Sequence, residues 1–290
     1  MEKIIFKSRA KINLYLKVLD KRGDGYHNIR TIFQEIDLAD DITIKKAPKK
    51  QGLTVECEDA SVPVDEKNLA YRAAALILSE KKINTGLKII INKIIPVKAG
   101  LAGGSSNAAA VLKACNNMFL PVLPFEKIFN LALSLGSDVP FFLKGGTALG
   151  EGRGEVLTAL PSLAETWFVI VTEGEKASTG AIYAKYRNAL TKTGVSGKNI
   201  LEFISKKNAA GGDIRKILFN DLEIPAGSIN PAIYRVKECL LAAGARGALM
   251  SGSGPSVFGI ADSKEDAESL AARVKQIYSR VIITKSVSPV

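Results

Sequence analysis

A glycine- and serine-rich stretch has the residue types that most directly indicate chemistry in this sequence. Residues 99–106 read Ala-Gly-Leu-Ala-Gly-Gly-Ser-Ser and lead into an alanine-rich segment. Small residues let backbone N–H groups approach a ligand closely, and a helix that begins at the serines adds unpaired amides and its dipole. An ordinary N-cap needs only one serine, so a purely structural role would not require the small residues before it. The stretch therefore predicts a phosphate-binding loop, although it matches neither GxxxxGK[ST] nor GxGxxG.

Strands and helices are both predicted before and after this loop. Apolar residues alternate over 12–18, which predicts a half-buried strand, and 31–38 and 41–46 have the composition of further strands. Helical spacing predicts helices over 68–81, from the glycine-rich loop to about 118, and over 125–135, and an apolar strand covers 87–95.

The second half of the chain continues this mixture. It predicts a strand at 167–172, helices at about 178–189, 198–208, 230–243 and 263–279, two strands around the glycine-rich 250–254 and a last strand at 280–287. Composition shifts at 150–165, so we predict two domains, residues 1–157 and 158–290. Because strands and helices do not alternate strictly, the pattern favours an α+β fold over a doubly wound sheet.

Length and composition exclude several classes of protein. The chain has 290 residues, 47% of them hydrophobic and 24% charged, which excludes a disordered or collagen-like chain. Apolar runs are too short for a membrane span, and charges interrupt the N-terminal residues, so we expect neither a membrane segment nor a signal peptide. Cys57, Cys115 and Cys239 lie far apart, which disfavours a disulfide framework or a zinc site and fits a cytoplasmic protein.

The net charge of +11 leaves two interpretations open. A basic chain suits a polyanionic ligand such as a nucleotide or a nucleic acid. A generally basic surface with no such ligand explains the charge equally well.

Three motifs resemble those of the GHMP kinases. Residues 96–109 resemble their ATP-phosphate loop, P-x-x-x-G-L-G-S/G-S-S-A/N-A, while 8–14 and 249–258 resemble the N-terminal and C-terminal motifs. Alanine stands at 99 and 102, where glycine is common, and Ala102 would be strained at a positive φ. The resemblance implies a two-domain α+β fold with a ribosomal-protein-S5-like N-terminal α/β domain, a ferredoxin-like C-terminal domain and an active site in the cleft between them.

Further segments narrow the resemblance. Residues 10–16, 22–29, 135–143 and 145–154 are similar to the 4-diphosphocytidyl-2-C-methyl-D-erythritol kinases, one family of GHMP kinases. The resemblance implies that ATP phosphorylates the 2-hydroxyl of this cytidyl sugar alcohol, a step of the non-mevalonate route to isoprenoids.

The resemblance implies that Asp138 and Lys11 are the catalytic pair. The aspartate would orient the hydroxyl and accept its proton late in the reaction. A weak base is sufficient for this, because positioning of the reactants supplies much of the rate of phosphoryl transfer. The lysine would hold Asp138 ionised and stabilise charge on the transferring group. Without the resemblance, Asp138 could be a turn or N-cap residue and Lys11 a surface lysine on a strand.

The resemblance also implies two sets of binding residues. His27, the single histidine of the chain, would read the cytosine edge, because imidazole can both donate and accept a hydrogen bond. Around it, Tyr26 and Tyr183 would lie near the base, and Asn13 would contact the erythritol. Thr179 would be a further substrate-binding residue. A structural histidine and a core tyrosine are the alternatives. The ATP side would comprise Asn68, Leu69, Lys93, Gly100, Leu101, Ala102, Gly103, Gly104, Ser105 and Ser106. A helix-start role for Asn68 and an ordinary strand-lysine role for Lys93 are the alternatives there.

The expected ligands are ATP as its Mg²⁺ complex and a cytidine-diphosphate sugar alcohol, with no prosthetic group, nucleic acid, membrane or obligate protein partner. No acidic cluster indicates an all-protein metal site, and Mg²⁺ commonly keeps phosphate and water ligands. Two alternatives stay open. One is another GHMP small-molecule kinase of the homoserine or mevalonate type, which would have no cytosine to recognise. The other is a non-catalytic nucleic-acid-binding protein, which would leave Asp138 and the 99–106 loop without a role.

Overall fold

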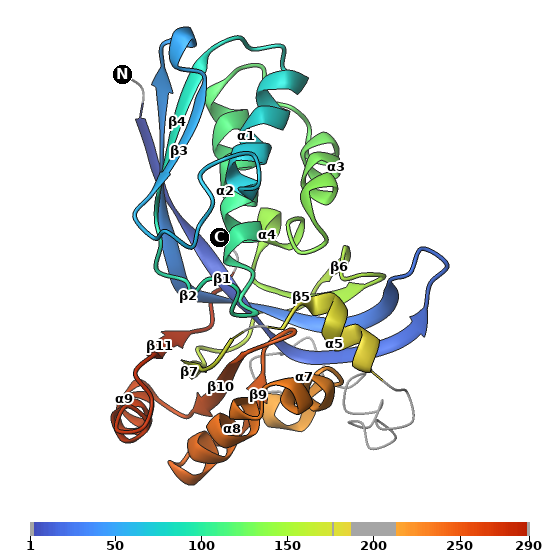
Figure 1. The fold of residues 1–290 in the computed structure, drawn as a ribbon, viewed down its shortest axis with the longest axis vertical. Helices are drawn as coiled ribbons and strands as arrows, with labels where there is room; N and C mark the ends of the chain where they lie inside the picture. The colour runs from blue at the N-terminus through green and yellow to red at the C-terminus, as the bar shows by residue number, and fades with distance from the viewer. Residues whose placement is uncertain (1–2, 176, 187–212, 289–290) are drawn as a thin grey trace. The chain divides into compact units, whose positions relative to one another are not determined.

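The computed structural model describes residues 3–175, 177–186 and 213–288 (Figure 1). The chain divides into two compact units: unit 1 comprises residues 1–10, 38–97 and 102–144, and unit 2 comprises 11–37, 98–101 and 145–290. Two long strands, β1 (Lys3–Lys21) and β2 (His27–Ala47), contribute residues to both units. The predicted helix at 198–208 lies outside the described residues, and the boundary at 157/158 stays a prediction.

A sheet with helices on one face forms unit 1 (Figure 1). Its strands follow the order β3-β4-β2-β1, with β3 (Leu53–Cys57) parallel to β4 (Gly86–Asn92) and β4 antiparallel to β2. The short helix η1 (Lys49–Gln51) follows β2. The predicted strands 31–38 and 41–46 are one continuous strand, β2. Its residue Asp40 is buried and accepts hydrogen bonds from the backbone of Ile94 and Ile95, so the polar residues there do not form a turn.

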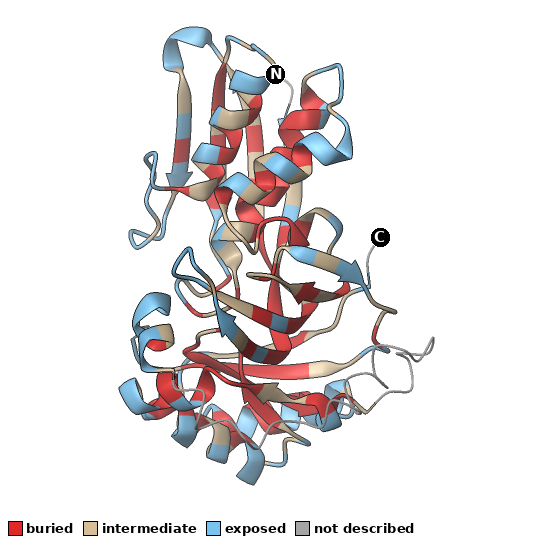
Figure 2. Ribbon diagram, turned by 90° about the vertical axis from the view of Figure 1, so that its right-hand side faces the viewer, coloured by how far each residue is buried: buried red, intermediate tan, exposed pale blue. Residues whose placement is uncertain are grey.

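The helices of unit 1 are α1 (Leu69–Glu80), α2 (Gly103–Met118), α3 (Phe125–Leu135) and α4 (Phe141–Lys144). Figure 2 shows buried residues concentrated where these helices face the sheet. α1 packs against α2, and both helices bury alanines completely, among them Ala73, Ala74, Ala108 and Ala109. Small side chains allow two helices to lie close together. The alanine-rich composition after the glycine-rich loop thus serves this packing.

Lys81 stabilises the C-terminal end of α2. The residue follows α1, and its ammonium donates to the carbonyls of Asn116, Phe119 and Pro121. The last carbonyls of a helix have no intrahelical donor, and a cation there also interacts favourably with the helix dipole. Desolvation lowers the pKa of Lys81.

Unit 2 contains the remaining parts of β1 and β2. Here β2 pairs with β5 (Thr147–Glu151), β5 pairs with β6 (Val156–Ala159), and β1 pairs in parallel with the short β8 (Phe219–Asn220). A second, antiparallel sheet has the order β11-β7-β10-β9. Its strands are β7 (Trp167–Thr172), β9 (Ala248–Met250), β10 (Ser256–Ala261) and β11 (Val281–Lys285).

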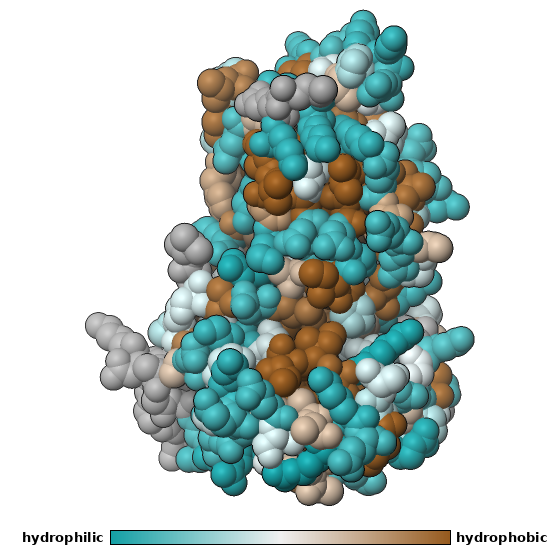
Figure 3. All heavy atoms as spheres, turned by 90° about the vertical axis from the view of Figure 1, so that its left-hand side faces the viewer, coloured by the Kyte–Doolittle hydropathy of each residue, from teal (hydrophilic) through white to brown (hydrophobic). Residues whose placement is uncertain are grey.

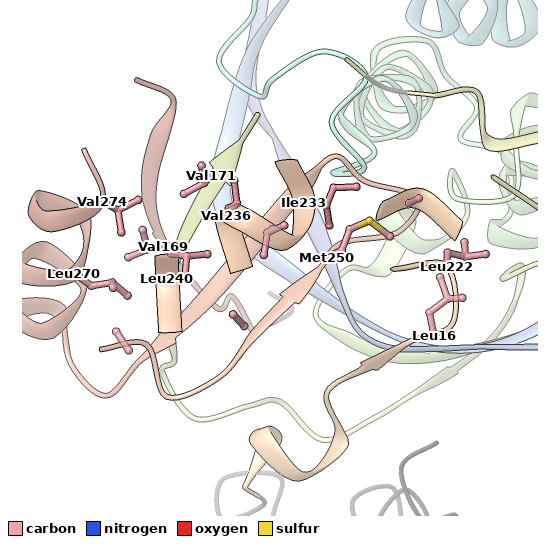
Figure 4. Close-up of a cluster of buried hydrophobic side chains, with 14 of the residues drawn as sticks. Leu16, Val169, Val171, Leu222, Ile233, Val236, Leu240, Met250, Leu270 and Val274 are labelled. Carbon is pink, nitrogen blue, oxygen red and sulfur yellow. The ribbon is translucent and has the colours of Figure 1, made fainter. Parts of the chain in front are cut away.

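In the part of unit 2 that the structure describes, helical segments accompany these sheets: α5 (Thr179–Lys185), η4 (Ile214–Ile217), α7 (Glu223–Ile229), α8 (Ala232–Ala242) and α9 (Lys264–Val274). Figure 4 shows part of the resulting core, in which Val169 and Val171 of β7 lie near Val236 and Leu240 of α8 and Val274 of α9. Val169 and Val171 are two residues apart on β7, which is apolar along almost its whole length, so they share one face of the sheet, and the helical spacing of apolar residues on α8 and α9 turns those side chains towards this face.

The prediction of a half-buried strand at 12–18 is wrong for its first part. Residues 10–16 of β1 are all at most 4% exposed, and they include Lys11 and Asn13. Polar side chains tolerate burial when they find hydrogen-bond partners, and both residues have such partners.

The exposed surface mixes polar and apolar side chains. On the face shown in Figure 3, hydrophilic side chains cover most of the surface and apolar areas interrupt them. Exposed apolar residues include Ile5, Leu120 and Ile277. None of the helices in the described part of the chain is both long enough and apolar enough to cross a membrane.

Candidate active site

The predicted phosphate loop leads into the first turn of α2, in unit 1. Ala102 precedes the helix in the left-handed region (φ 56°), its side chain makes no capping hydrogen bond, and its carbonyl accepts from Ser106 N at 2.9 Å. The amides of Gly103, Gly104 and Ser105 have no carbonyl four residues earlier within the helix. Gly104 is exposed. The start of α2 therefore offers N–H donors and the positive end of a helix dipole to an anion.

The two serines of the loop differ in their surroundings. Ser106 is buried, and its hydroxyl lies 2.7 Å from the hydroxyl of Ser8, which also donates to Asn107 Oδ1 at 2.8 Å. Ser105 is only partly buried. Ser106 thus belongs to a buried polar network that fixes the first turn of α2, while Ser105 lies nearer the surface.

Two predicted ATP residues lie at the start of α1. Asn68 is the N-cap of this helix: its Oδ1 accepts from Ala70 N at 2.8 Å, and its Nδ2 donates to Pro63 O at 2.6 Å. Leu69 lies beside the phosphate loop, because a methyl group built on Gly104 would be 3.9 Å from its Cδ1. The structure therefore gives Asn68 a capping role and brings Leu69 next to the loop.

Lys93, the third predicted ATP residue, lies in a buried ion pair. Its Nζ is 2.8 Å from Asp40 Oδ2 and donates to Ile95 O at 2.5 Å, with the two side chains 7% and 0% exposed. A methyl group built on Gly103 would lie 3.1 Å from this Nζ. Lys93 is thus close to the start of α2, and its charge is balanced by Asp40.

Asp138 lies in the turn between α3 and α4, also in unit 1. The turn is closed by a hydrogen bond from Val139 N to Gly136 O at 3.1 Å, and Val139 is fully buried. Lys113 of α2 donates to Phe142 O at 3.0 Å, which ties the following helix to α2. Asp138 itself is partly buried. The fold thus holds this carboxylate on a hydrogen-bonded turn, and the helix after that turn is tied to α2, which begins at the predicted phosphate loop.

Lys11 and Asn13 meet in unit 2. Lys11 Nζ donates to Asn13 Oδ1 at 2.6 Å and to Gly100 O at 3.4 Å, and it lies 5.4 Å from the centroid of the Phe33 ring. Asn13 Nδ2 donates to Thr31 Oγ1 at 2.7 Å. Residues two apart on a strand share a face, so β1 presents the lysine and the asparagine together.

The glycine-rich loop at 251–254 packs against Lys98–Leu101. A methyl group on Gly100, whose φ is +80°, would lie 2.4 Å from Ser251 O, so this position requires glycine. The hydroxyl of Ser251 donates to Gly100 O at 3.1 Å. A methyl group on Gly252 would lie 3.3 Å from Asn13 Oδ1 and 3.5 Å from Lys11 Nζ. Two motifs that are distant in sequence therefore enclose Lys11 and Asn13.

The predicted cytosine-binding residues also lie in unit 2, where they have different contacts. The rings of His27 and Tyr183 stack with centroids 5.2 Å apart, and Tyr186 approaches His27 edge-on at 6.3 Å. Tyr26 is 58% exposed, and the Arg153 guanidinium lies 5.0 Å from its ring centroid. The hydroxyl of Thr179 lies 3.1 Å from that of Ser253. The structure thus joins His27 with Tyr183, while Tyr26 pairs with Arg153.

Comparison with known proteins places the chain in a family. The model of the GHMP kinases N terminal domain matches residues 68–146, and that of the GHMP kinases C terminal matches 200–280. A 4-diphosphocytidyl-2-C-methyl-D-erythritol kinase from Geobacter metallireducens is 44% identical over 94% of this chain and 95% of its own length. The chain belongs to this family of GHMP kinases. A Moorella thermoacetica relative of the same name is 41% identical over 99% of this chain and all of its own.

Solved structures of GHMP kinases have the same fold. The crystal structure of a 4-(cytidine 5'-diphospho)-2C-methyl-D-erythritol kinase covers 98% of this chain and 99% of its own, with a TM-score of 0.82 and 33% identity. A homoserine kinase from Cytophaga hutchinsonii gives a TM-score of 0.76 at 20% identity and covers all of this chain and 96% of its own, which shows the fold alone. The predicted α+β GHMP kinase fold is confirmed, and the protein is an ATP-dependent small-molecule kinase.

Several residues of this GHMP kinase have contacts that its sequence did not indicate. Three polar residues at or next to β8 are buried: Asn220, Asp221 and Glu223. Asn220 donates to a backbone carbonyl elsewhere in unit 2, and the two carboxylates accept from backbone N–H groups there. Their signal in the sequence is a run of polar residues, 220–223, with only Leu222 between them. Asp40 was missed as well. Among the described residues, no group of three or more His, Cys, Asp or Glu side chains lies together to hold a metal ion.

Proposed function

We propose that this protein transfers the γ-phosphoryl group of ATP to the 2-hydroxyl of 4-diphosphocytidyl-2-C-methyl-D-erythritol, which yields the 2-phosphate and ADP. Its relatives that carry this name match nearly the full chain. The structural observation that carries the proposal is the stack of His27 on Tyr183. An aromatic face beside a group that can donate and accept hydrogen bonds suits a pyrimidine base, and cytosine distinguishes this substrate from homoserine and mevalonate.

In the proposed mechanism, Asp138 orients the 2-hydroxyl and accepts its proton as the oxygen attacks the γ-phosphorus. The bond from the γ-phosphorus to the β,γ-bridging oxygen breaks, and its electron pair leaves with ADP. The transition state is loose, so placement of the two reactants supplies much of the rate. The hydrogen-bonded turn around Asp138, with its buried neighbour Val139, supports this role.

Lys11 and Asn13 act on the phosphoryl acceptor side. The Lys11 ammonium stabilises the charge that spreads over the transferring group. Its bond to Asn13 fixes its direction, and Asn13 contacts the erythritol part of the substrate. Burial of this lysine supports the assignment, because a charge in a poorly solvated site interacts more strongly with its ligand.

The start of α2 and residues 100–106 hold the phosphates of ATP. The amides at 103–105 donate to phosphate oxygens, and Ser105 adds a hydroxyl. Mg²⁺ enters as part of the ATP substrate. Leu69 lines the purine side, and Asn68 and Lys93 support that side through the α1 cap and the pair with Asp40. The protein is proposed to act in the cytoplasm on these two small substrates, with no obligate protein partner, nucleic acid or membrane.

The release of ADP from Mg-ATP tests this function. Wild type, Asp138→Asn and the control Asp41→Asn, a surface aspartate of unit 1 paired with Lys7, are assayed with the cytidyl substrate, homoserine and mevalonate. We expect turnover with the cytidyl substrate only, reduced about 10²- to 10⁴-fold in Asp138→Asn and unchanged in the control. Turnover with another alcohol would contradict the assignment of His27. No turnover at all, together with salt-dependent RNA binding, would favour the nucleic-acid alternative.

A further inference from the structure

Asn220 has every polar group of its side chain engaged inside unit 2. It is the last residue of β8 and is 5% exposed. Its Nδ2 donates to Met250 O and to Gly252 O, both at 2.8 Å, and its Oδ1 accepts from Leu222 N at 2.9 Å. The two carbonyls belong to the segment that turns from β9 into the glycine-rich loop. One buried amide therefore fixes the position of that loop at two points.

The loop held by Asn220 is in direct contact with the group assigned to phosphoryl transfer. Gly252 lies close enough to Lys11 and Asn13 that an added methyl group would be 3.5 Å from Lys11 Nζ and 3.3 Å from Asn13 Oδ1. Gly252 also has a φ of +57°, so its conformation depends on glycine and on the bonds that hold it. A shift of this loop by a few tenths of an ångström would alter the space beside Lys11.

The polar residues after Asn220 attach the same segment to two other elements. Glu223 accepts from Met250 N at 2.9 Å and pairs with Lys237 of α8. Asp221 Oδ2 accepts from Val18 N of β1 at 2.7 Å. The register of β8 on β1 places Asn220 opposite Leu16. Asn220 is thus itself anchored to the strand that carries Lys11 and Asn13, so it can hold the loop at a fixed place relative to them.

We propose that Asn220 is a positioning residue for phosphoryl transfer: by donating to the carbonyls of Met250 and Gly252, it keeps the 251–254 loop against Lys11 and Asn13. It touches neither substrate in this role. The inference rests on the proposed roles of Lys11 and Asn13. It predicts that loss of the two donated bonds lowers kcat more than it raises the KM for ATP, because the groups displaced belong to the acceptor side.

The substitution Asn220→Asp tests this directly. The carboxylate keeps the shape of the side chain and the acceptor for Leu222 N, but it cannot donate to either carbonyl. We expect kcat to fall about 10- to 100-fold, with the KM for ATP changed by less than about threefold. Protonation returns one O–H donor, so the ratio of variant to wild-type kcat should rise as the pH is lowered. A residue that only supports folding would not give this pH dependence.

Asn230→Asp is the matched control, because Asn230 is another asparagine of unit 2 that donates to a backbone carbonyl, Glu173 O, and accepts from Ala232 N. We expect its kcat to equal that of wild type. Asn220→Ser is the second variant: its neutral hydroxyl can donate one bond, so it should fold even if Asn220→Asp does not, and its kcat should lie between those of Asn220→Asp and wild type. Folding is checked by circular dichroism and thermal midpoint.

Three results would overturn the inference. They are wild-type kcat in a folded Asn220→Asp or Asn220→Ser protein, an equal loss of kcat in Asn230→Asp, and a loss in Asn220→Asp that only follows the unfolded fraction. Absence of turnover in the wild-type protein would instead refute the proposed function, and the role of Asn220 would fall with it.

Discussion

His27 and Tyr183 combine an aromatic stack with a group that can form hydrogen bonds. The two rings stack on each other, and a neutral imidazole has one donor and one acceptor nitrogen. Centroids 5.2 Å apart leave no room for a base between the two rings. We therefore expect cytosine to lie beside this pair and to be recognised along the imidazole edge, and not to insert between the two rings.

Substitution of Tyr183 tests this arrangement. Tyr183→Ala removes one stacking surface, which is worth about 1–3 kcal/mol per base, so the KM for the cytidyl substrate should rise about 5- to 150-fold. The KM for ATP should stay the same. Tyr183→Phe keeps the ring and is the control with expected wild-type behaviour. An equal rise of both KM values would show that the tyrosine supports the fold rather than the base.

Variants of the Lys93–Asp40 ion pair can distinguish a structural role of Lys93 from a role in ATP binding. Lys93→Met leaves Asp40 buried without its ammonium partner and should lower the free energy of unfolding by about 3–5 kcal/mol. Lys93→Met/Asp40→Asn removes both charges and should recover much of that loss. Urea denaturation measures both values. If Lys93 also contacts ATP, the double variant will be stable and still have a raised KM for ATP, whereas an unchanged KM would refute the contact.

The sequence identified which residue types can do chemistry, but it did not show which of them are already engaged. Ser105 and Ser106 are adjacent and alike, yet only Ser106 is hydrogen-bonded to Ser8, which lies far away in sequence. Lys93 and Asp40 are 53 residues apart in the chain and meet because β2 and β4 pair. Contacts of this kind depend on strand register, which no local pattern encodes.

Among the elements, the start of α2 contains a strained residue. Ala102 has a φ of 56°, where a Cβ costs about 1–2 kcal/mol. Ala102→Gly should therefore raise the free energy of unfolding by up to about 1 kcal/mol, because the added freedom of glycine in the unfolded chain offsets part of the gain.

An alanine-to-glycine substitution inside the same helix should have the opposite effect on the free energy of unfolding. Ala108→Gly should lower the free energy of unfolding by about 1 kcal/mol, because glycine weakens a helix interior. Urea denaturation followed by circular dichroism measures both variants. A loss of stability in Ala102→Gly would mean that its methyl contacts outweigh the backbone strain.

Long, strongly patterned elements were predicted well and short ones were not. The helices at 68–81 and 125–135 and the strand at 167–172 agree with α1, α3 and β7. The two-residue strand β8 and the short helices α4 and α7 were missed. Segments of two to seven residues contain at most about two periods, which is too few for a pattern to be recognised. Such segments depend on tertiary contacts, as β8 does on its pairing with β1 and on the bonds of Asn220.

At the scale of the whole molecule, one buried thiol makes the free energy of unfolding depend on pH in the alkaline range. Burial raises the pKa of Cys115 from 9.0 to about 12. Above pH 9 the thiol ionises in the unfolded chain but not in the folded one, so the unfolded state is favoured as the pH rises from 9 towards 12. The expected loss is about 1.4 kcal/mol per pH unit.

Cys115→Ala provides the comparison, because it lacks this titration. The difference in unfolding free energy between wild type and Cys115→Ala, measured by urea denaturation below and above pH 9, should shift against the wild type as the pH rises. A constant difference would show that the thiol ionises equally in both states.

The lysine at the far end of α2 has a consequence for ligand binding. Lys81 places a cation on the last carbonyls of the helix and just beyond them, whereas the proposed function would place phosphates at the opposite end only when nucleotide binds. Under that proposal, one end of the helix dipole is balanced in the free protein and both ends are balanced in the nucleotide complex. Acetylation of Lys81 would remove the charge at the first of these ends, so the stability of α2 should then depend more strongly on bound nucleotide.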